Sequence, residues 1–206
     1  MAEGVISQNL TTAAELSLRF WQAVAFVIPV TLAGLIHIAV IKLDLFAALG
    51  RCPLDQHLTL RGRRLLGQNK TLRGALIMTG ATSLMTGLLA QTAAPLYQRL
   101  AICPFQVSHP WLWGLLVGAG YWLGELPNSF VKRQLDIAPG AMAAGTTGIV
   151  FWLVDQLDSV AGVFLLLSIV WRPDALLIVI VAAMALLLHP LVAALMVALR
   201  LKVRVG

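Results

Sequence analysis

Long apolar stretches alternate with short polar segments along the whole chain. Four apolar stretches cover 20–41, 74–90, 151–171 and 175–199. Another begins with residues 111–123 and runs into the polar stretch that follows. Because about 20 apolar residues in a helix cross the hydrocarbon core of a bilayer, the pattern predicts transmembrane helices rather than half-buried helices of a soluble protein. We therefore expect an all-α fold, a polytopic membrane helix bundle of about five transmembrane helices.

Composition agrees with this pattern. The 206 residues are 59% hydrophobic and only 12% charged, and the mean hydropathy is +0.87. A soluble domain is about 45–50% apolar and about 25% charged, so the balance indicates an integral membrane protein. The length suits one integral-membrane domain over 1–206. The basic residues lie at the ends of apolar stretches, as membrane topology requires, so we expect no nucleic-acid partner.

The lysines and arginines set the expected orientation. Twelve of the fifteen lie in the segment 42–73, in the polar stretch after the third span, or at the C-terminus, and the other three are isolated. The positive-inside rule then predicts an outer N-terminus, a cytosolic C-terminus and cytosolic loops at about 42–73 and 125–150. We expect a multi-pass protein of the inner or cytoplasmic membrane, with Cys52 and Cys103 on opposite sides and hence no disulfide between them.

The polar stretch Gly124–Asp158 is the first candidate for chemistry, because charges beside lipid are costly and are kept mostly where they face a polar cavity or the membrane surface. Asp155 and Asp158 are three residues apart, so on a helix they share one face. Two carboxylates at this spacing suit Mg²⁺, and Glu125 is positioned to complete the site. The alternative is that these acids lie at the interface, solvated or paired with neighbouring cations. We place both aspartates near the inner end of the fourth span.

Neighbouring cations suggest an anionic ligand. Lys132 and Arg133 diverge by roughly 100° on a regular helix, but at a helix end or in a loop they can meet one phosphate. The alternative is that they extend to the membrane surface as ordinary positive-inside charges. Ser129 and Asn128 are candidate donors to phosphate or caps of the following turn.

The segment 42–73 carries a second basic group. Lys70 and Thr71 lie beside glycines, and such a turn lets backbone N–H groups approach an anion. The Walker A pattern is absent, and the alternative role is an anchor to anionic lipid headgroups. Elsewhere, Gly114 and Gly118 form a GxxxG pair that predicts close helix packing.

Three ordered blocks resemble the CDP-archaeol synthase family of membrane cytidylyltransferases, which are related to phosphatidate cytidylyltransferase. The blocks are Pro53-Leu54-Asp55 with the glycine-rich run to Asn69-Lys70-Thr71-x-Arg73-Gly74, then Gly124-Glu125-x-x-x-Ser129-Phe130-Val131-Lys132-Arg133, and then Asp155-Gln156-Leu157-Asp158. Glu125 stands where the family usually has aspartate.

The resemblance implies an enzyme that joins CTP to a lipid phosphate, giving a CDP-activated lipid and pyrophosphate. It implies Mg²⁺ on Asp155, Asp158 and Glu125, and catalytic roles for the two aspartates with Lys132 and Arg133. Cofactor-binding roles fall to Lys70, Asn69, Thr71, Arg73, Ser129 and Asn128. The lipid is left open between archaeol phosphate-like and phosphatidate-like, as is the oligomeric state. The alternative function is a non-catalytic membrane scaffold or transporter subunit that binds anionic lipid or partners.

Overall fold

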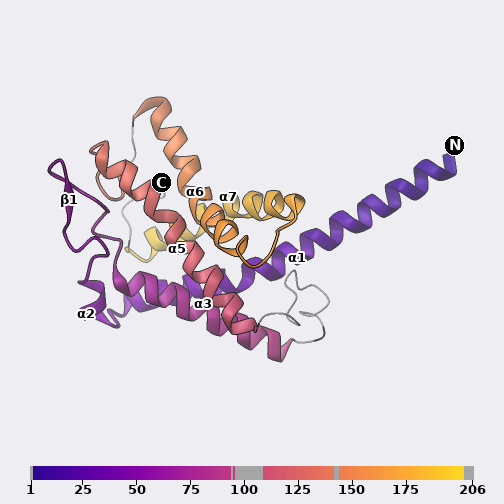
Figure 1. The fold of residues 1–206 in the computed structure, drawn as a ribbon, viewed down its shortest axis with the longest axis horizontal. Coiled ribbons are helices and arrows are strands. Elements are labelled where there is room, and N and C mark those ends of the chain that lie inside the picture. Colours follow the sequence, from indigo (N-terminus) through magenta and orange to yellow (C-terminus); the bar gives the residue numbers. More distant parts are fainter. Residues whose placement is uncertain (1, 94, 96–108, 142–143, 202–206) are drawn as a thin grey trace.

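The protein is a bundle of long helices with one small hairpin (Figure 1). The structure, a computed structural model, describes residues 2–93, 95, 109–141 and 144–201, with side chains from residue 12 onward. Its elements are α1 (Ala2–Lys42), α2 (Ala47–Gly50), β1 (Thr59–Leu60), β2 (Arg63–Arg64), α3 (Leu72–Thr92), α5 (Pro110–Gln134), α6 (Gly145–Leu167) and α7 (Ala175–Ala198). The predicted all-α fold is confirmed.

Four of the described helices are long and apolar enough to cross a membrane: α1 from Thr12 onward, α3, α6 and α7. The remaining predicted span lies within α5, whose 25 residues reach about 37 Å at 1.5 Å per residue but carry polar side chains in the last third. The chain is therefore a multi-pass membrane protein. The side of the membrane on which each end lies stays a prediction, and Cys103 lies outside the described residues.

Several element boundaries differ from those predicted. α1 already begins at Ala2, and the differences that matter for the polar stretch concern α5 and α6. α5 continues through Pro127 to Gln134, so the segment expected to start a loop at 125 is helical up to that point. Proline is tolerated inside such a helix because neighbouring helices and side chains can satisfy the backbone groups that it leaves free. α6 begins at Gly145 and ends at Leu167, which places Asp155 and Asp158 midway along the helix rather than near its inner end. The helix includes Gly145 and Gly148 despite the low helix propensity of glycine.

Glycines allow α5 to approach its neighbours closely. A side chain at Gly118 would come within 2.7 Å of the Met78 carbonyl oxygen in α3, which confirms the close packing expected of the Gly114/Gly118 pair. On another face, a Cβ at Gly124 would lie 2.3 Å from the Asp158 carbonyl oxygen, and a Cβ at Gly162 would lie 2.4 Å from the Gly124 Cα. The α5–α6 contact is therefore made by backbone against backbone.

An apolar core joins α1, α5, α6 and α7. Phe26 of α1 stacks on Phe164 of α6 with ring centroids 5.5 Å apart, and Leu167 and Leu177 are fully buried beside them. The N-terminal part of α1 extends away from this bundle (Figure 1). The connection to α7 ends at Asp174, which caps the helix by accepting a hydrogen bond from the Leu177 N–H at 3.2 Å.

Replacing Gly162 with leucine should separate α5 from α6, because the new side chain has no space. Overpacking of this kind costs about 1–3 kcal/mol, and we expect a lower midpoint of thermal unfolding in detergent. The matched control is Gly80→Leu in α3, where an added Cβ meets nothing within 4 Å. Equal midpoints for the two variants would contradict the backbone contact.

Candidate functional site

A polar cavity lies where the last third of α5, the middle of α6 and the loop before α3 meet. Its volume is ≈ 210 Å³. Nine predicted residues line it: Asn69, Lys70, Glu125, Asn128, Ser129, Lys132, Arg133, Asp155 and Asp158. Residues from three parts of the sequence that are far apart along the chain thus share one wall.

Asn128 connects the two aspartates of α6. Its Nδ2 donates to Asp155 Oδ1 at 2.6 Å and to Asp158 Oδ2 at 2.8 Å. Its Oδ1 is buried and has no hydrogen-bond partner. The carboxylates therefore face the same point across the α5–α6 seam, as the three-residue spacing predicts, next to an acceptor that is still free.

Lys132 and Arg133 diverge along the helix but both reach the cavity. The Lys132 ammonium donates to both carboxylate oxygens of Asp155 at 2.5 Å. The Arg133 guanidinium lies beside Gly67 of the loop, and its Nε and Nη1 are buried without a hydrogen-bond partner. A buried guanidinium with unpaired donors is suited to a bidentate anion such as a phosphate.

Lys70 closes the cavity from the loop side. It forms an ion pair with Glu125 and is largely buried. Burial by itself would lower the pKa of Lys70, but the carboxylates of Glu125, Asp158 and Asp155 outweigh it and raise the pKa above the usual value. The ammonium therefore stays charged at neutral pH.

Ser159 was not among the predicted site residues, yet it lies between the carboxylates. Its side chain is 1% exposed, and its Oγ lies 3.4 Å from Glu125 Oε1 and 3.2 Å from Asp158 Oδ1. A single serine in an apolar helix gives little sequence signal. The only sequence feature that could have indicated a role at the site is its position directly after Asp158.

Two predicted residues do not reach the cavity. Thr71 caps α3, with its hydroxyl accepting from the Gly74 N–H at 3.3 Å. Arg73 turns away and donates to Asp44 Oδ1 at 3.1 Å and to the Leu45 carbonyl oxygen at 3.2 Å. Both hold the loop and helix that carry Lys70.

The loop that supplies Asn69 and Lys70 is organised by one buried carboxylate, Asp55. It accepts hydrogen bonds from the Leu66 N–H at 3.0 Å and the His57 N–H at 3.2 Å, and it pairs with the Arg64 guanidinium. Burial raises the pKa of Asp55, but these three donors outweigh it and lower the pKa below the usual range.

The hairpin and the loop dock on α5. β1 and β2 pair antiparallel through a two-residue turn with positive φ at both central residues, Arg61 and Gly62, a conformation that matches the twist of the strands. The Gly67 N–H donates to Ser129 Oγ at 3.2 Å, and Gln134 Nε2 donates to the Arg64 carbonyl oxygen at 3.2 Å. Ser129 thus fixes the loop as well as lining the cavity.

The cavity wall also contains Ala138–Ala141, a short segment with no charged side chain that sequence reasoning did not select. Within the described residues, no three histidine, cysteine, aspartate or glutamate side chains are arranged as one metal-ligand group. The carboxylates predicted as metal ligands are instead divided between Asn128, Lys132, Lys70 and Ser159.

Comparison with known proteins identifies the family. The family model described as CDP-archaeol synthase (CarS-like) matches residues 32–205. The CDP-archaeol synthase of Methanopyrus kandleri is 34% identical over 145 residues, which cover 68% of this chain and 71% of that protein. The CDP-archaeol synthase of Methanospirillum hungatei is 31% identical over 153 residues, covering 70% of this chain and 84% of that one.

The chain belongs to the CDP-archaeol synthase family. A solved structure described as an intramembrane enzyme for archaeal membrane lipids biosynthesis is 32% identical, covers 82% of this chain and 92% of that one, and gives a TM-score of 0.53. The predicted resemblance is confirmed. The protein is a membrane enzyme, a CTP-dependent lipid cytidylyltransferase, and the scaffold alternative is not favoured. A divalent-metal requirement is consistent with this family.

Asp55→Asn should loosen the loop, because an amide cannot accept all three hydrogen bonds as an anion does. We expect faster trypsin cleavage at Arg61 and Arg63 in detergent. Since the folded pKa of Asp55 lies below its unfolded value, the stabilisation is complete above about pH 4 and is lost only as the pH falls through the lowered value. The difference from wild type should therefore be constant across the neutral range.

The matched control for this test is Asp44→Asn, which removes a carboxylate that is largely exposed and pairs with Arg73. Its cleavage rate should stay close to that of the wild type, because the amide oxygen can still accept from Arg73 and the Leu45 carbonyl oxygen also holds the guanidinium. An Asp55→Asn protein cleaved no faster than this control would contradict the organising role of Asp55.

Proposed function

We propose that the polar cavity is the active site and that it joins CTP to a lipid phosphate of the archaeol phosphate or phosphatidate kind. The single observation that carries this proposal is the group of three carboxylates and three cations in one cavity of an apolar bundle. A soluble nucleotide triphosphate and a lipid headgroup can meet only where a polar cavity lies at membrane depth. We regard residues 1–206 as one catalytic membrane domain.

The donor set fits Mg²⁺. Asp155 and Asp158 offer carboxylate oxygens on one side of α6, and the unpartnered Oδ1 of Asn128 lies beside them. Mg²⁺ usually takes one or two carboxylates and completes its shell with water and substrate phosphates, so two aspartates are sufficient. When bound, it would act as a Lewis acid on the phosphates and as a template for the reactants. Glu125, paired with Lys70, is a further ligand candidate.

The cations of the chain neutralise the phosphates. Arg133 has two buried nitrogens whose N–H groups have no partner and can donate to phosphate oxygens, and Lys70 lines the same cavity. The Lys132 ammonium is hydrogen-bonded to Asp155 and becomes available to a phosphate when the Asp155 carboxylate binds a metal ion instead. Ser129, Asn128 and Asn69 orient the bound groups by hydrogen bonds. In this proposal Thr71 and Arg73 act indirectly, by holding the loop.

The reaction needs positioning and charge neutralisation more than acid–base chemistry. An oxygen of the lipid phosphate attacks the α-phosphorus of CTP in line, the new P–O bond forms, and the α–β P–O bond breaks to release pyrophosphate. The second pKa of a phosphate monoester is about 6, so the attacking oxygen is already ionised at neutral pH. Phosphoryl-group chemistry of this type is driven by fixed charges around the reacting phosphates.

Asp155→Asn and Asp158→Asn should each abolish turnover, because an amide is a poor ligand for Mg²⁺. We expect kcat to fall at least about 100-fold, which corresponds to about 2.7 kcal/mol, in an assay of pyrophosphate release from CTP with lipid phosphate, with and without EDTA. The control is Asp136→Asn, whose carboxylate pairs with Arg63 outside the cavity. Retained activity in a folded Asp155 or Asp158 variant would sink this metal assignment.

Ser159→Ala should weaken metal binding while leaving the fold intact. Groups that orient ligating carboxylates typically change metal affinity by about 10–100-fold, so the Mg²⁺ concentration for half-maximal activity should rise by about tenfold. The KM for CTP at saturating Mg²⁺ should stay unchanged, which a general structural defect would not allow. The control is Ser168→Ala at the exposed end of the same helix, and an identical metal titration for both variants would exclude this role.

A further inference from the structure

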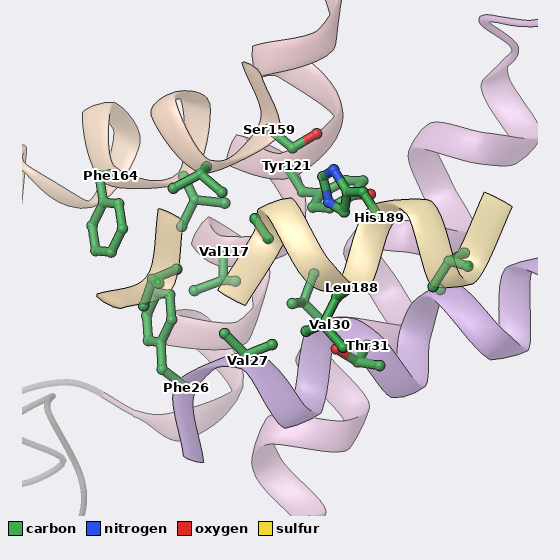
Figure 2. A pocket seen from close by; sticks show the side chains of 16 residues that line it. Phe26, Val27, Val30, Thr31, Val117, Tyr121, Ser159, Phe164, Leu188 and His189 are labelled. Atoms are coloured by element: carbon green, nitrogen blue, oxygen red, sulfur yellow. The ribbon is translucent and has the colours of Figure 1, made fainter. Parts of the chain in front are cut away.

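Two apolar hollows lie close to the polar cavity, and the chemistry of the reaction requires a place for hydrocarbon. One is a groove of ≈ 710 Å³ along the seam of α5 and α6. The other is a smaller cavity of ≈ 160 Å³ between α1, α5, α6 and α7, with Phe26, Val117 and Leu188 in its wall (Figure 2). The two hollows differ in whether they are connected to the polar cavity that contains the carboxylates.

The groove is continuous with the polar cavity. Asn128 and Asp158 line both of them, so the two spaces meet at the carboxylate pair. The rest of the groove wall is apolar apart from its glycines, with Val131 and Phe151 toward one end and Ile169 at the other. A ligand with a charged head and an apolar tail matches this change of polarity.

The smaller cavity has no residue in common with the polar cavity. The hydroxyl-bearing side chains Tyr121 and Ser159 and the ring of His189 line one end of it (Figure 2), and Ser159 is hydrogen-bonded to Glu125 and Asp158. A chain placed there would be separated from the reacting phosphates by this polar layer. Its volume is also less than a quarter of that of the groove.

The groove opens on the exposed surface of α6, a helix long and apolar enough to cross a membrane. Leu165 is 72% exposed and Ile169 is 75% exposed, and both lie on its wall. From Asp158 to Leu166 the groove follows α6 for roughly 12 Å at 1.5 Å per residue, and Ile169 lies in the turn just beyond the end of the helix. A lipid could therefore enter sideways from the membrane, with its tail parallel to α6.

We propose that the α5–α6 groove binds the hydrocarbon tail of the lipid phosphate, with the phosphate held beside Asn128 and Asp158 and the first part of the tail lying along α6 to Ile169. This inference rests on the proposed function, and it names the occupant of the groove as a long-chain lipid phosphate. Tail beyond Ile169 extends into the bilayer and contributes no contact with α6. The affinity for the lipid should therefore increase with the length of its tail until the tail reaches the end of the groove, and no further.

The test uses the full-length protein in mixed micelles with two substrates that share a glycerol phosphate head, one with long chains and one with short chains. Ala161→Trp fills the groove one turn from Asp158, and Leu165→Gln makes its wall polar. Each should raise the KM for the long-chain substrate by about tenfold or more, the loss expected when a few methylene groups are no longer buried. The rise in KM should be smaller for the short-chain substrate, which makes fewer contacts with the groove, and the KM for CTP, which does not occupy the groove, serves as the internal reference.

Two control variants give the comparison. Val179→Trp places the same bulk on the exposed face of α7, away from the groove, and should behave as wild type. Val192→Trp fills the smaller cavity. Groove variants with the wild-type KM for long-chain lipid would overturn the proposal, as would a rise in KM for Val192→Trp alone.

A second measurement does not depend on turnover. A long-chain lipid phosphate with a photoreactive group near the middle of its chain should label the segment from Leu165 to Ile169, at the C-terminal end of α6 and just beyond it, and Ala161→Trp should remove this label. Labelling spread equally over α7 would show ordinary annular lipid and overturn the proposal. Absence of pyrophosphate release with either substrate, together with specific labelling, would contradict the proposed reaction but not the groove.

Discussion

The structure depends on the pairing of charges within a helix that is apolar enough to span a membrane. A single aspartate at the centre of such a helix costs about 2.5–3.5 kcal/mol on insertion scales, and α6 carries two of them. Asn128 and Lys132 of α5 supply the donors that satisfy Asp155, while Ser159 and Asn128 satisfy Asp158. The pairing of α5 with α6 follows from this requirement, and the loop adds Lys70 as the partner of Glu125.

Much of this arrangement could be predicted from the sequence. The apolar stretches identified the helices, the three-residue spacing put both aspartates on one face, and the GxxxG pair predicted close packing of its helix. The ordered blocks gave the family. These features are local, and each has a direct physical signature in spacing or composition.

Other features could not be predicted because they depend on contacts between distant segments. The continuation of α5 beyond Pro127 turned an expected loop into a helix, and with it Lys132 and Arg133 took divergent directions. Thr71 and Arg73 belonged to a recognisable block but serve the backbone around the cavity. Ser159 was hidden because a serine in an apolar helix looks like an interhelical contact, and only the fold shows that its neighbours are carboxylates.

The glycine contact between α5 and α6 has a consequence for how the enzyme responds to its surroundings. Where helices meet through large side chains, a change of rotamer can alter their spacing. At Gly124 and Gly162 the peptide backbones themselves are in contact, so there is nothing to repack and the distance is set by the helix radius. The polar faces that begin one turn away are therefore held at a fixed separation, and the geometry of the cavity should be insensitive to the thickness and fluidity of the bilayer around it.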